Sequence, residues 1–255
     1  MKLHVHPDYK YLTPLLRGIP NGEYKCEKVF CNKRNIVELT TFLGRKYVIK
    51  RYKRPTLFNC LMYTFFRKSK ARRAYDYALL LMERGINTPF PVAYIEEKKW
   101  GIFYTGYFIS EYLPYSTLRD LKVADLSVEE YKRLAKDIIS YTIELNDKKV
   151  LPLDFNPGNI FCYRKDNDRH WRFALTDVNR MQFGKMVGFN DTMRAFAQFG
   201  ITTDKIYKVM VEYSLQKNID IDFAMFVFLF YRIRRRSVSV MKRKVRSVLH
   251  KEHAI

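Results

Sequence analysis

Residues 150 to 161 read Val150-Leu151-Pro152-Leu153-Asp154-Phe155-Asn156-Pro157-Gly158-Asn159-Ile160-Phe161. Asp154 and Asn159 stand five positions apart on a loop that opens into an apolar strand. The Pro157-Gly158 pair tightens this loop, so both polar side chains can point into one cleft. Phosphoryl transfer needs a carboxylate that orients the attacking hydroxyl and takes its proton, and a neutral oxygen ligand for a metal beside it. The spacing therefore predicts Asp154 as a catalytic base and Asn159 as a metal ligand.

Two further charged side chains extend this set. Asp177 follows a short apolar strand, where a carboxylate can hold the magnesium ions that bridge the β- and γ-phosphates of ATP. Lys50 ends the strand run 47–50, and its charge can meet the α- and β-phosphates. The order of strand lysine, helix, hinge, D-x-x-x-x-N and strand aspartate is typical of a kinase-type site. Each residue also has a plain structural interpretation when it is taken alone. Asp154, Asn159 and Asp177 could be ordinary turn residues, and Lys50 could lie on a solvated strand face.

The hydrophobic pattern changes period near residues 111–114. Before this point, β-rich runs at 29–31, 36–43, 46–50, 92–96 and 101–110 predict a meandering sheet, and residues 69–84 predict a helix closed by Gly85. After it, Ser127 and Glu130 form a capping-box signature, and the chain beyond about Thr192 has helical character. We therefore predict an α+β fold of two lobes. Residues 1–112 would form an N-terminal ATP-binding lobe of antiparallel sheet plus one helix, and residues 113–255 a mainly helical catalytic lobe with a basic tail.

The charge balance indicates an anionic partner. The chain has 47 Lys and Arg against 26 Asp and Glu, a formal net charge of +21. Nucleic acid, a phosphorylated glycolipid and a membrane surface would all suit this charge, but no zinc-finger, RRM or helix-turn-helix pattern favours a nucleic-acid-binding protein. The four cysteines lack CxxC spacing, so we expect reduced thiols and neither a zinc site nor disulfides. No apolar leader or membrane-length run is present, which predicts a cytoplasmic protein.

Two basic segments alternate with apolar residues. Residues 45–75 hold eleven Lys and Arg and no acid, interleaved with aromatic side chains. This segment could bind the phosphates and acyl edge of a glycolipid, or form a packed helix with solvated flanks. Residues 232–251 hold nine further bases and have the character of a helix drawn to anionic lipid, although packing across the helical lobe is the alternative.

Several segments resemble the bacterial lipopolysaccharide kinases that act on Kdo or heptose of the inner core. They are residues 50–54, 69–75, 85–93, 154–160, 177–181 and 183–186, and the likeness extends over roughly residues 28–200. The resemblance implies a protein-kinase-like fold, ATP with Mg²⁺, and a sugar hydroxyl as phosphate acceptor. It also implies an anionic glycolipid substrate, a lipopolysaccharide precursor, met at the inner face of the cytoplasmic membrane.

Three features depart from the pattern of that family. Pro152 stands where a histidine usually precedes the catalytic aspartate by two residues, and the phosphate-covering loop, residues 32–35, contains no glycine. The helix acid expected to pair with Lys50, and so to support cofactor binding, falls at Asp76, whose helix face is equally suited to a solvated aspartate. These departures leave open a non-catalytic kinase-like module that binds lipid or protein.

Overall fold

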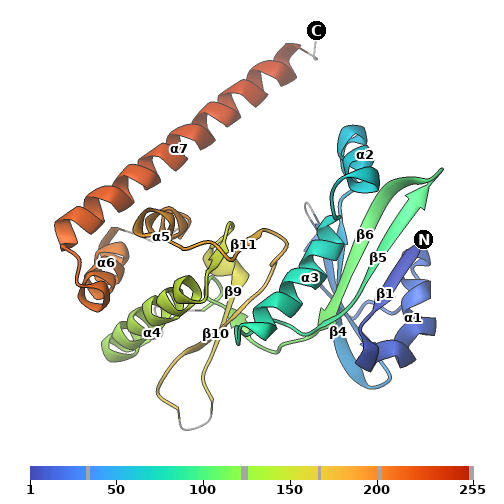
Figure 1. Ribbon diagram of the computed structural model, residues 1–255, viewed down its shortest axis with the longest axis horizontal. Coiled ribbons are helices and arrows are strands. Elements are labelled where there is room, and N and C mark those ends of the chain that lie inside the picture. Colours follow the sequence, from blue (N-terminus) through green and yellow to red (C-terminus); the bar gives the residue numbers. More distant parts are fainter. Residues whose placement is uncertain (33–34, 122–125, 166–167, 200–202, 253–255) are drawn as a thin grey trace. The chain divides into compact units, whose positions relative to one another are not determined.

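The computed structural model describes residues 1–32, 35–121, 126–165, 168–199 and 203–252 (Figure 1). The chain forms two compact units, each discontinuous in sequence. The first comprises Met1–Tyr115 and Ala174–Met181, and the second Ser116–Phe173 and Gln182–Ile255. The chain enters the first unit for the second time within β10 (Arg172–Leu175) and leaves it again within β11 (Met181–Phe183).

The first unit is built on a six-stranded antiparallel sheet in the order β1-β5-β6-β4-β3-β2. Its strands are β1 (Lys2–Val5), β2 (Lys28–Asn32), β3 (Asn35–Phe42), β4 (Arg45–Tyr52), β5 (Pro91–Lys99) and β6 (Ile102–Glu111). β3 and β4 are joined by Leu43 and Gly44, both with positive φ, which is the two-residue hairpin turn that matches strand twist. The five predicted strands are confirmed, and β1 joins them at the edge beside β5.

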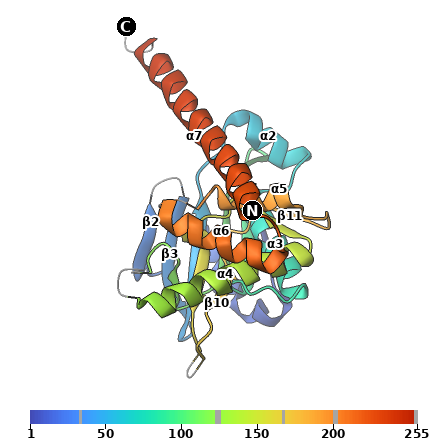
Figure 2. The same ribbon diagram turned by 90° about the vertical axis from the view of Figure 1, so that its left-hand side faces the viewer.

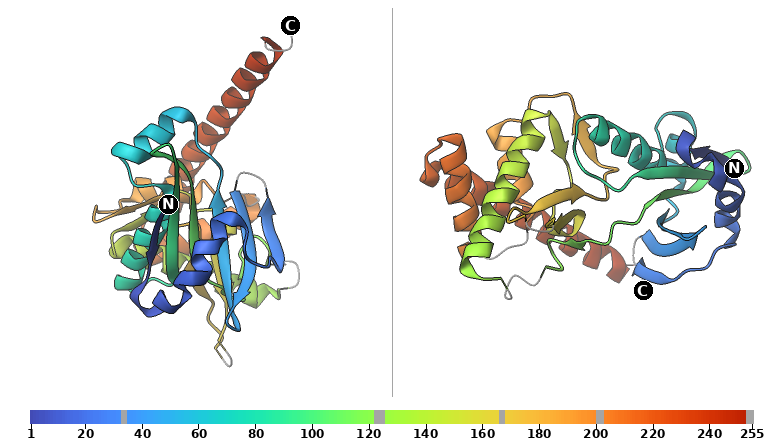
Figure 3. Two further views of the ribbon diagram at one scale, coloured as in Figure 1. Left: turned by 90° about the vertical axis from the view of Figure 1, so that its right-hand side faces the viewer. Right: turned by 90° about the horizontal axis from the view of Figure 1, so that it is seen from below.

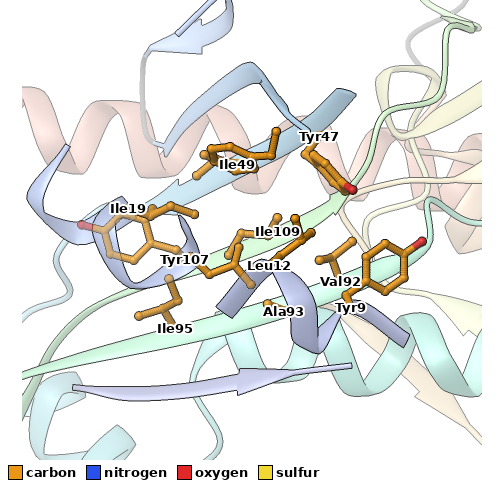
Figure 4. Packing of buried hydrophobic residues seen from close by; sticks show 12 residues of the cluster. Tyr9, Leu12, Ile19, Tyr47, Ile49, Val92, Ala93, Ile95, Tyr107 and Ile109 are labelled. Carbon is orange, nitrogen blue, oxygen red and sulfur yellow. The ribbon is translucent and has the colours of Figure 1, made fainter. Parts of the chain in front are cut away.

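Side chains alternate along each strand, so the sheet presents two different faces. Ile49, Ile95 and Ile109 point to one face, where they pack against Leu12 and Leu16 (Figure 4). Those leucines belong to an N-terminal segment of η1 (Pro7–Leu12), α1 (Thr13–Gly18) and η2 (Ile19–Asn21). The left panel of Figure 3 shows this dark-blue segment on one side of the strands and the teal helices on the other. The segment was not predicted.

The opposite face of the sheet is covered by α3 (Lys70–Glu83). Ser69 caps this helix by accepting a hydrogen bond from the Arg72 N–H, and Gly85 follows it with φ 67°, so the predicted helix is confirmed with both its ends. Its buried stripe is Ala71, Ala74, Tyr75, Ala78 and Leu81. The described part of this unit also contains α2 (Leu57–Phe65), so α1 and α2 add to the single helix expected.

The second unit is mainly helical. It contains α4 (Val128–Asp147), α5 (Phe189–Phe196), α6 (Thr203–Lys217) and α7 (Ile221–Glu252). α4 packs on α6, and α7 contacts α5 and α6 (Figure 2). The capping box of Ser127 and Glu130 is formed, as predicted. Within the described ranges, no helix combines the length and the apolar character needed to cross a membrane.

Short strands frame the predicted catalytic loop in this unit. β7 (Ser116–Thr117), β9 (Ile160–Tyr163) and β10 form a sheet in the order β10-β9-β7, and β8 (Val150–Pro152) pairs with β11. The loop with Asp154 lies between β8 and β9, and its last residues form the short 3-10 turn η4 (Pro157–Asn159). Both ends of the loop are therefore held by strands.

The packing of α3 gives a stability prediction for two neighbouring side chains. Leu81→Ala should lower the free energy of unfolding by about 2 to 5 kcal/mol, because Leu81 is fully buried and its removal leaves a cavity. Met82→Ala on the same helix is the matched control and should cost less than about 1 kcal/mol, since this side chain is 37% exposed. Urea denaturation followed by circular dichroism measures both; equal losses would contradict the orientation of α3.

Candidate active site

Lys50 lies on β4 and points to the face of the sheet that α3 covers. Its Nζ is 2.5 Å from Oδ1 of Asp177, and the two side chains are 12% and 32% exposed. The ring of Tyr52, two positions along β4, lies 5.4 Å from the same Nζ. Burial, with the negative charge of Asp177, raises the pKa of Tyr52 well above its usual value, so this ring remains neutral. The lysine charge is thus held between one carboxylate and one aromatic face.

The chain segment that carries Asp177 is held to the rest of the first unit by hydrogen bonds at Leu175. The Leu175 N–H donates to the Asn87 carbonyl at 2.9 Å, and the Thr88 hydroxyl donates to the Leu175 carbonyl at 2.8 Å. Asp177 itself has φ 55°, a left-handed conformation that aspartate tolerates better than most residues and that is common at functional sites. Asn179 donates from Nδ2 to Oδ1 of Asp177. Within the described ranges, Oδ2 of Asp177 forms no hydrogen bond or ion pair.

The predicted pair between Lys50 and Asp76 is not formed. Asp76 instead binds Lys68, with Nζ and Oδ2 2.6 Å apart, and lies 3.8 Å from Nε of Arg72. Asp76 is absent from the buried stripe of α3, so bases near the start of the helix reach it first. The assignment of Asp76 to cofactor binding is therefore corrected: it is a partner of other cations of the same basic segment.

The loop with Asp154 and Asn159 is ordered by its own hydrogen bonds. Asn159 donates from Nδ2 to the Asp154 carbonyl at 3.0 Å, so Oδ1 of Asn159 is left as an acceptor. Asn156 donates from Nδ2 to Oδ1 of Asp154 at 3.0 Å and accepts the Gly158 N–H at 3.0 Å. Asn156, which the sequence analysis did not single out, thus connects the carboxylate to the turn that follows it.

Arg119 is a second residue that the sequence analysis missed. Its Nη2 donates to Oδ1 of Asn156 at 2.8 Å, and its backbone N–H donates to the Pro157 carbonyl at 3.3 Å. A Cβ on Gly158 would lie 2.6 Å from Cζ of Arg119, so the glycine permits the guanidinium to approach the loop closely. The Pro157-Gly158 sequence indicated a turn. The contact of this turn with Arg119, which is distant in the chain, could not be predicted from any motif.

The loop is also anchored without the missing histidine. Phe155 is 1% exposed, and its ring packs 5.2 Å from that of Phe199. Gln198 donates from Nε2 to the Leu153 carbonyl at 3.4 Å, and Pro152 is buried at the end of β8. Packing by Phe199 and a hydrogen bond from Gln198, both in the segment after α5, therefore hold the part of the loop next to Pro152.

The oxygen atoms available fit a magnesium ion that also binds phosphate. Within the described residues, no group of three or more His, Cys, Asp and Glu side chains could hold a metal. Magnesium in phosphoryl transfer, however, is commonly bound through one or two protein oxygens, with phosphate and water oxygens completing its shell. Oδ2 of Asp177, in the first unit, is an oxygen of this kind, and Oδ1 of Asn159, in the second unit, stays a predicted ligand. Lys33 and Arg34, which belong to the predicted phosphate-covering loop, lie outside the described residues.

Comparison with known proteins identifies the fold. No protein-family model matches the chain, and no curated protein does. Among solved structures, the chain is similar to WaaP in its complex with acyl carrier protein, with a TM-score of 0.61 and 16% sequence identity. The likeness covers 92% of this chain and 98% of that one. The predicted protein-kinase-like α+β fold is therefore confirmed over nearly the whole chain.

The partly buried pair of Lys50 and Asp177 should be measurably coupled. A double-mutant cycle with Lys50→Met and Asp177→Asn should give an interaction energy of about 1 to 3 kcal/mol in the free energy of unfolding. The exposed pair of Lys132 and Glu129 is the matched control, and its cycle with Lys132→Met and Glu129→Gln should give less than about 0.5 kcal/mol. Equal coupling in the two cycles would show that the first pair contributes no more than a solvated one.

Proposed function

We propose that this chain is an ATP-dependent kinase that phosphorylates a sugar hydroxyl, on Kdo or heptose, in the inner core of a lipopolysaccharide precursor. The observation that carries the proposal is the ion pair of Lys50 and Asp177, which joins a strand lysine to a strand-end aspartate. A strand lysine for the nucleotide phosphates and an aspartate for the metal are two parts of a phosphoryl-transfer site, and this ion pair brings such residues together. The protein-kinase-like fold shared with WaaP agrees with this proposal, as does the resemblance of several sequence segments to lipopolysaccharide inner-core kinases.

In this proposal each residue has a separate task. Asp154 orients the acceptor hydroxyl and takes its proton as the acceptor oxygen bonds to the γ-phosphorus and the bond to the β-phosphate oxygen breaks. Lys50 meets the α- and β-phosphates, and Asp177 and Asn159 hold Mg²⁺. The metal, when bound, neutralises charge that develops on the phosphate oxygens. Asn156 and Arg119 act as positioning residues, because their hydrogen bonds reach Asp154 and its loop rather than a substrate.

The charge of the chain supports the proposed substrate and location. A phosphorylated glycolipid in the cytoplasmic membrane suits a chain with a formal net charge of +21, and we expect no nucleic-acid partner. α7 supplies one basic surface: Arg234, Arg236 and Arg243 are exposed on it, next to exposed apolar residues such as Ile233 and Val238. The side chains of Lys242 and Lys244 lie outside the described part. The complex of WaaP with acyl carrier protein makes that carrier a further partner to test for this chain.

The catalytic assignment predicts two separable losses. Asp154→Asn should lower turnover by about 10²- to 10⁴-fold while leaving the affinity for ATP largely unchanged, because only the base is removed. Asp177→Ala should weaken Mg²⁺-dependent ATP binding, because its carboxylate is assigned to the metal. Isothermal titration and a phosphate-transfer assay on a core oligosaccharide measure both, with the exposed Asp222→Asn as control.

Near-normal turnover of Asp154→Asn would reject the assignment of the base. Absence of transfer by the wild-type chain with every core acceptor, despite normal folding, would instead favour the non-catalytic module. Mass spectrometry of lipopolysaccharide from cells with and without the gene identifies the acceptor through one missing phosphate. The transfer assay therefore tests whether the chain is a kinase, and mass spectrometry tests which sugar it phosphorylates.

The positioning role of Asn156 predicts a loss confined to the chemical step. Asn156→Ala should lower kcat by about 10- to 100-fold with little change in the KM for ATP, since the Asp154 carboxylate loses the hydrogen bond that orients it. Arg119→Ala should cause a smaller loss of the same kind, and the two effects should be less than additive because the side chains act through one contact. Fully additive effects in steady-state kinetics would contradict this connection.

A further inference from the structure

α2 presents an apolar stripe to solvent. Its inner side packs on β6: the Tyr63 ring lies 5.4 Å from that of Phe103, and the Phe103 N–H donates to the Thr64 hydroxyl at 2.9 Å. On the outer side, four large apolar side chains fall within an arc of about 100° around the helix axis. They are Leu57, Phe58, Leu61 and Phe65, and all but Leu61 are 68–71% exposed. A helix of a soluble domain normally turns such a stripe inward.

A fully exposed tryptophan lies at the end of the neighbouring hairpin. Trp100 is 99% exposed and, with Gly101, forms the turn between β5 and β6. Trp100 has φ 48°, a left-handed conformation in which glycine, asparagine and aspartate are preferred. Within the described structure, the Trp100 side chain is not stabilised by burial, and its backbone conformation is unfavourable. Folding stability therefore does not explain a tryptophan at this turn.

The hairpin end and the start of α2 meet at one aromatic ring. The Tyr104 ring has Nζ of Lys99 4.1 Å from its centroid and the guanidinium of Arg54 4.8 Å from it. Lys99 precedes Trp100, and Arg54 lies just before α2, so the end of the β5–β6 hairpin lies near the start of α2 in the first unit (Figure 1). We call Leu57, Phe58, Leu61, Phe65 and Trp100 together the apolar docking surface.

Positive charge surrounds the docking surface. Lys53 and Arg54 precede α2, Arg67 follows it, and all three are exposed. The chain from residue 45 to residue 75 contains no acid. A second copy of the chain would bring the same bases together and is opposed by their repulsion, whereas anionic headgroups would neutralise them. Aromatic side chains with flanking bases are the combination that suits a lipid–water interface.

We infer that the apolar docking surface binds an anionic lipid bilayer, with α2 lying in the interface and Trp100 at the level of the headgroups. The inference deepens the proposed function and rests on it for the location of the acceptor in a membrane. It assigns membrane contact to the first unit, which carries Lys50, in addition to any contact made by α7 in the second.

Trp100 itself provides a direct test. In a Trp171→Phe chain, Trp100 is the sole tryptophan, and its emission should shift to shorter wavelength with vesicles of phosphatidylglycerol and phosphatidylethanolamine. Brominated acyl chains should quench it, and phosphatidylcholine vesicles should give a weaker response. The Trp100→Phe chain, in which Trp171 remains, is the control and should show no shift.

A triple variant tests the stripe. Phe58→Ser, Leu61→Ser and Phe65→Ser together should lower sedimentation with the anionic vesicles by at least about tenfold, because three interfacial side chains are lost. The matched control carries Val128→Ser, Met186→Ser and Leu215→Ser, three exposed apolar residues of the second unit, and should bind as wild type does. Circular dichroism and ATP affinity establish that both triple variants are folded.

The inference is overturned if Trp100 emission is unchanged while the chain sediments with vesicles, or if the triple variant binds as wild type does. It is also overturned if no anionic vesicle binds, or if only acyl carrier protein shifts the emission. Loss of binding in an Arg234→Gln, Arg235→Gln and Arg236→Gln chain, with none in the stripe variant, would assign the membrane contact to α7 alone. Transfer to a soluble core oligosaccharide is measured in parallel, so failure of the docking surface is distinguished from failure of the kinase assignment.

Discussion

In the proposed function, the chemistry of the first unit depends on one contact, the ion pair of Lys50 and Asp177. Because side chains alternate along β4, Lys50 faces Asp177 only while Tyr47 and Ile49 face the opposite side of the sheet. A shift of β4 by one residue would turn the lysine into the core formed with Leu12 and Leu16 and remove two large apolar side chains from that core. The N-terminal segment, which packs on the other face of the sheet, therefore fixes the orientation of the lysine.

The loop with Asp154, in the second unit, is held mainly by side-chain hydrogen bonds and by one buried ring. Asn156 forms hydrogen bonds with Asp154 and with Arg119, and Phe155 is buried. The histidine that Pro152 replaces is mainly a structural support, and here other side chains hold the same stretch of backbone. The geometry thus weakens one of the sequence arguments for a non-catalytic module, the one based on Pro152.

The parts of the fold that sequence predicted are those with strong local signals. β4 is rich in aromatic and β-branched residues, α3 has a serine cap and a closing glycine, and α4 has a capping box. The N-terminal segment was missed because its pieces are too short to establish a period, although Leu12, Leu16 and Ile19 have helical spacing.

The site shows the same limit. Lys50 and Asp177 were predicted from the order of motif elements along the chain, and the structure places the two side chains in contact. Asp76 was predicted to form an ion pair with Lys50 because of its position in the helix sequence. That position does not reveal which of several nearby bases is closest, and in the structure it is Lys68. Arg119 and Trp100 depend on contacts and exposure that only three-dimensional structure reveals.

The first unit contains Ala174–Met181, a segment made long after the rest of it. On the ribosome, the sheet and α3 can assemble once residue 115 has emerged, yet Lys50 then lacks its carboxylate. The unit is completed only when the chain has been translated beyond residue 181, by which time the whole loop with Asp154 exists. Neither half of the gene alone would therefore encode an intact first unit that contains both Lys50 and Asp177.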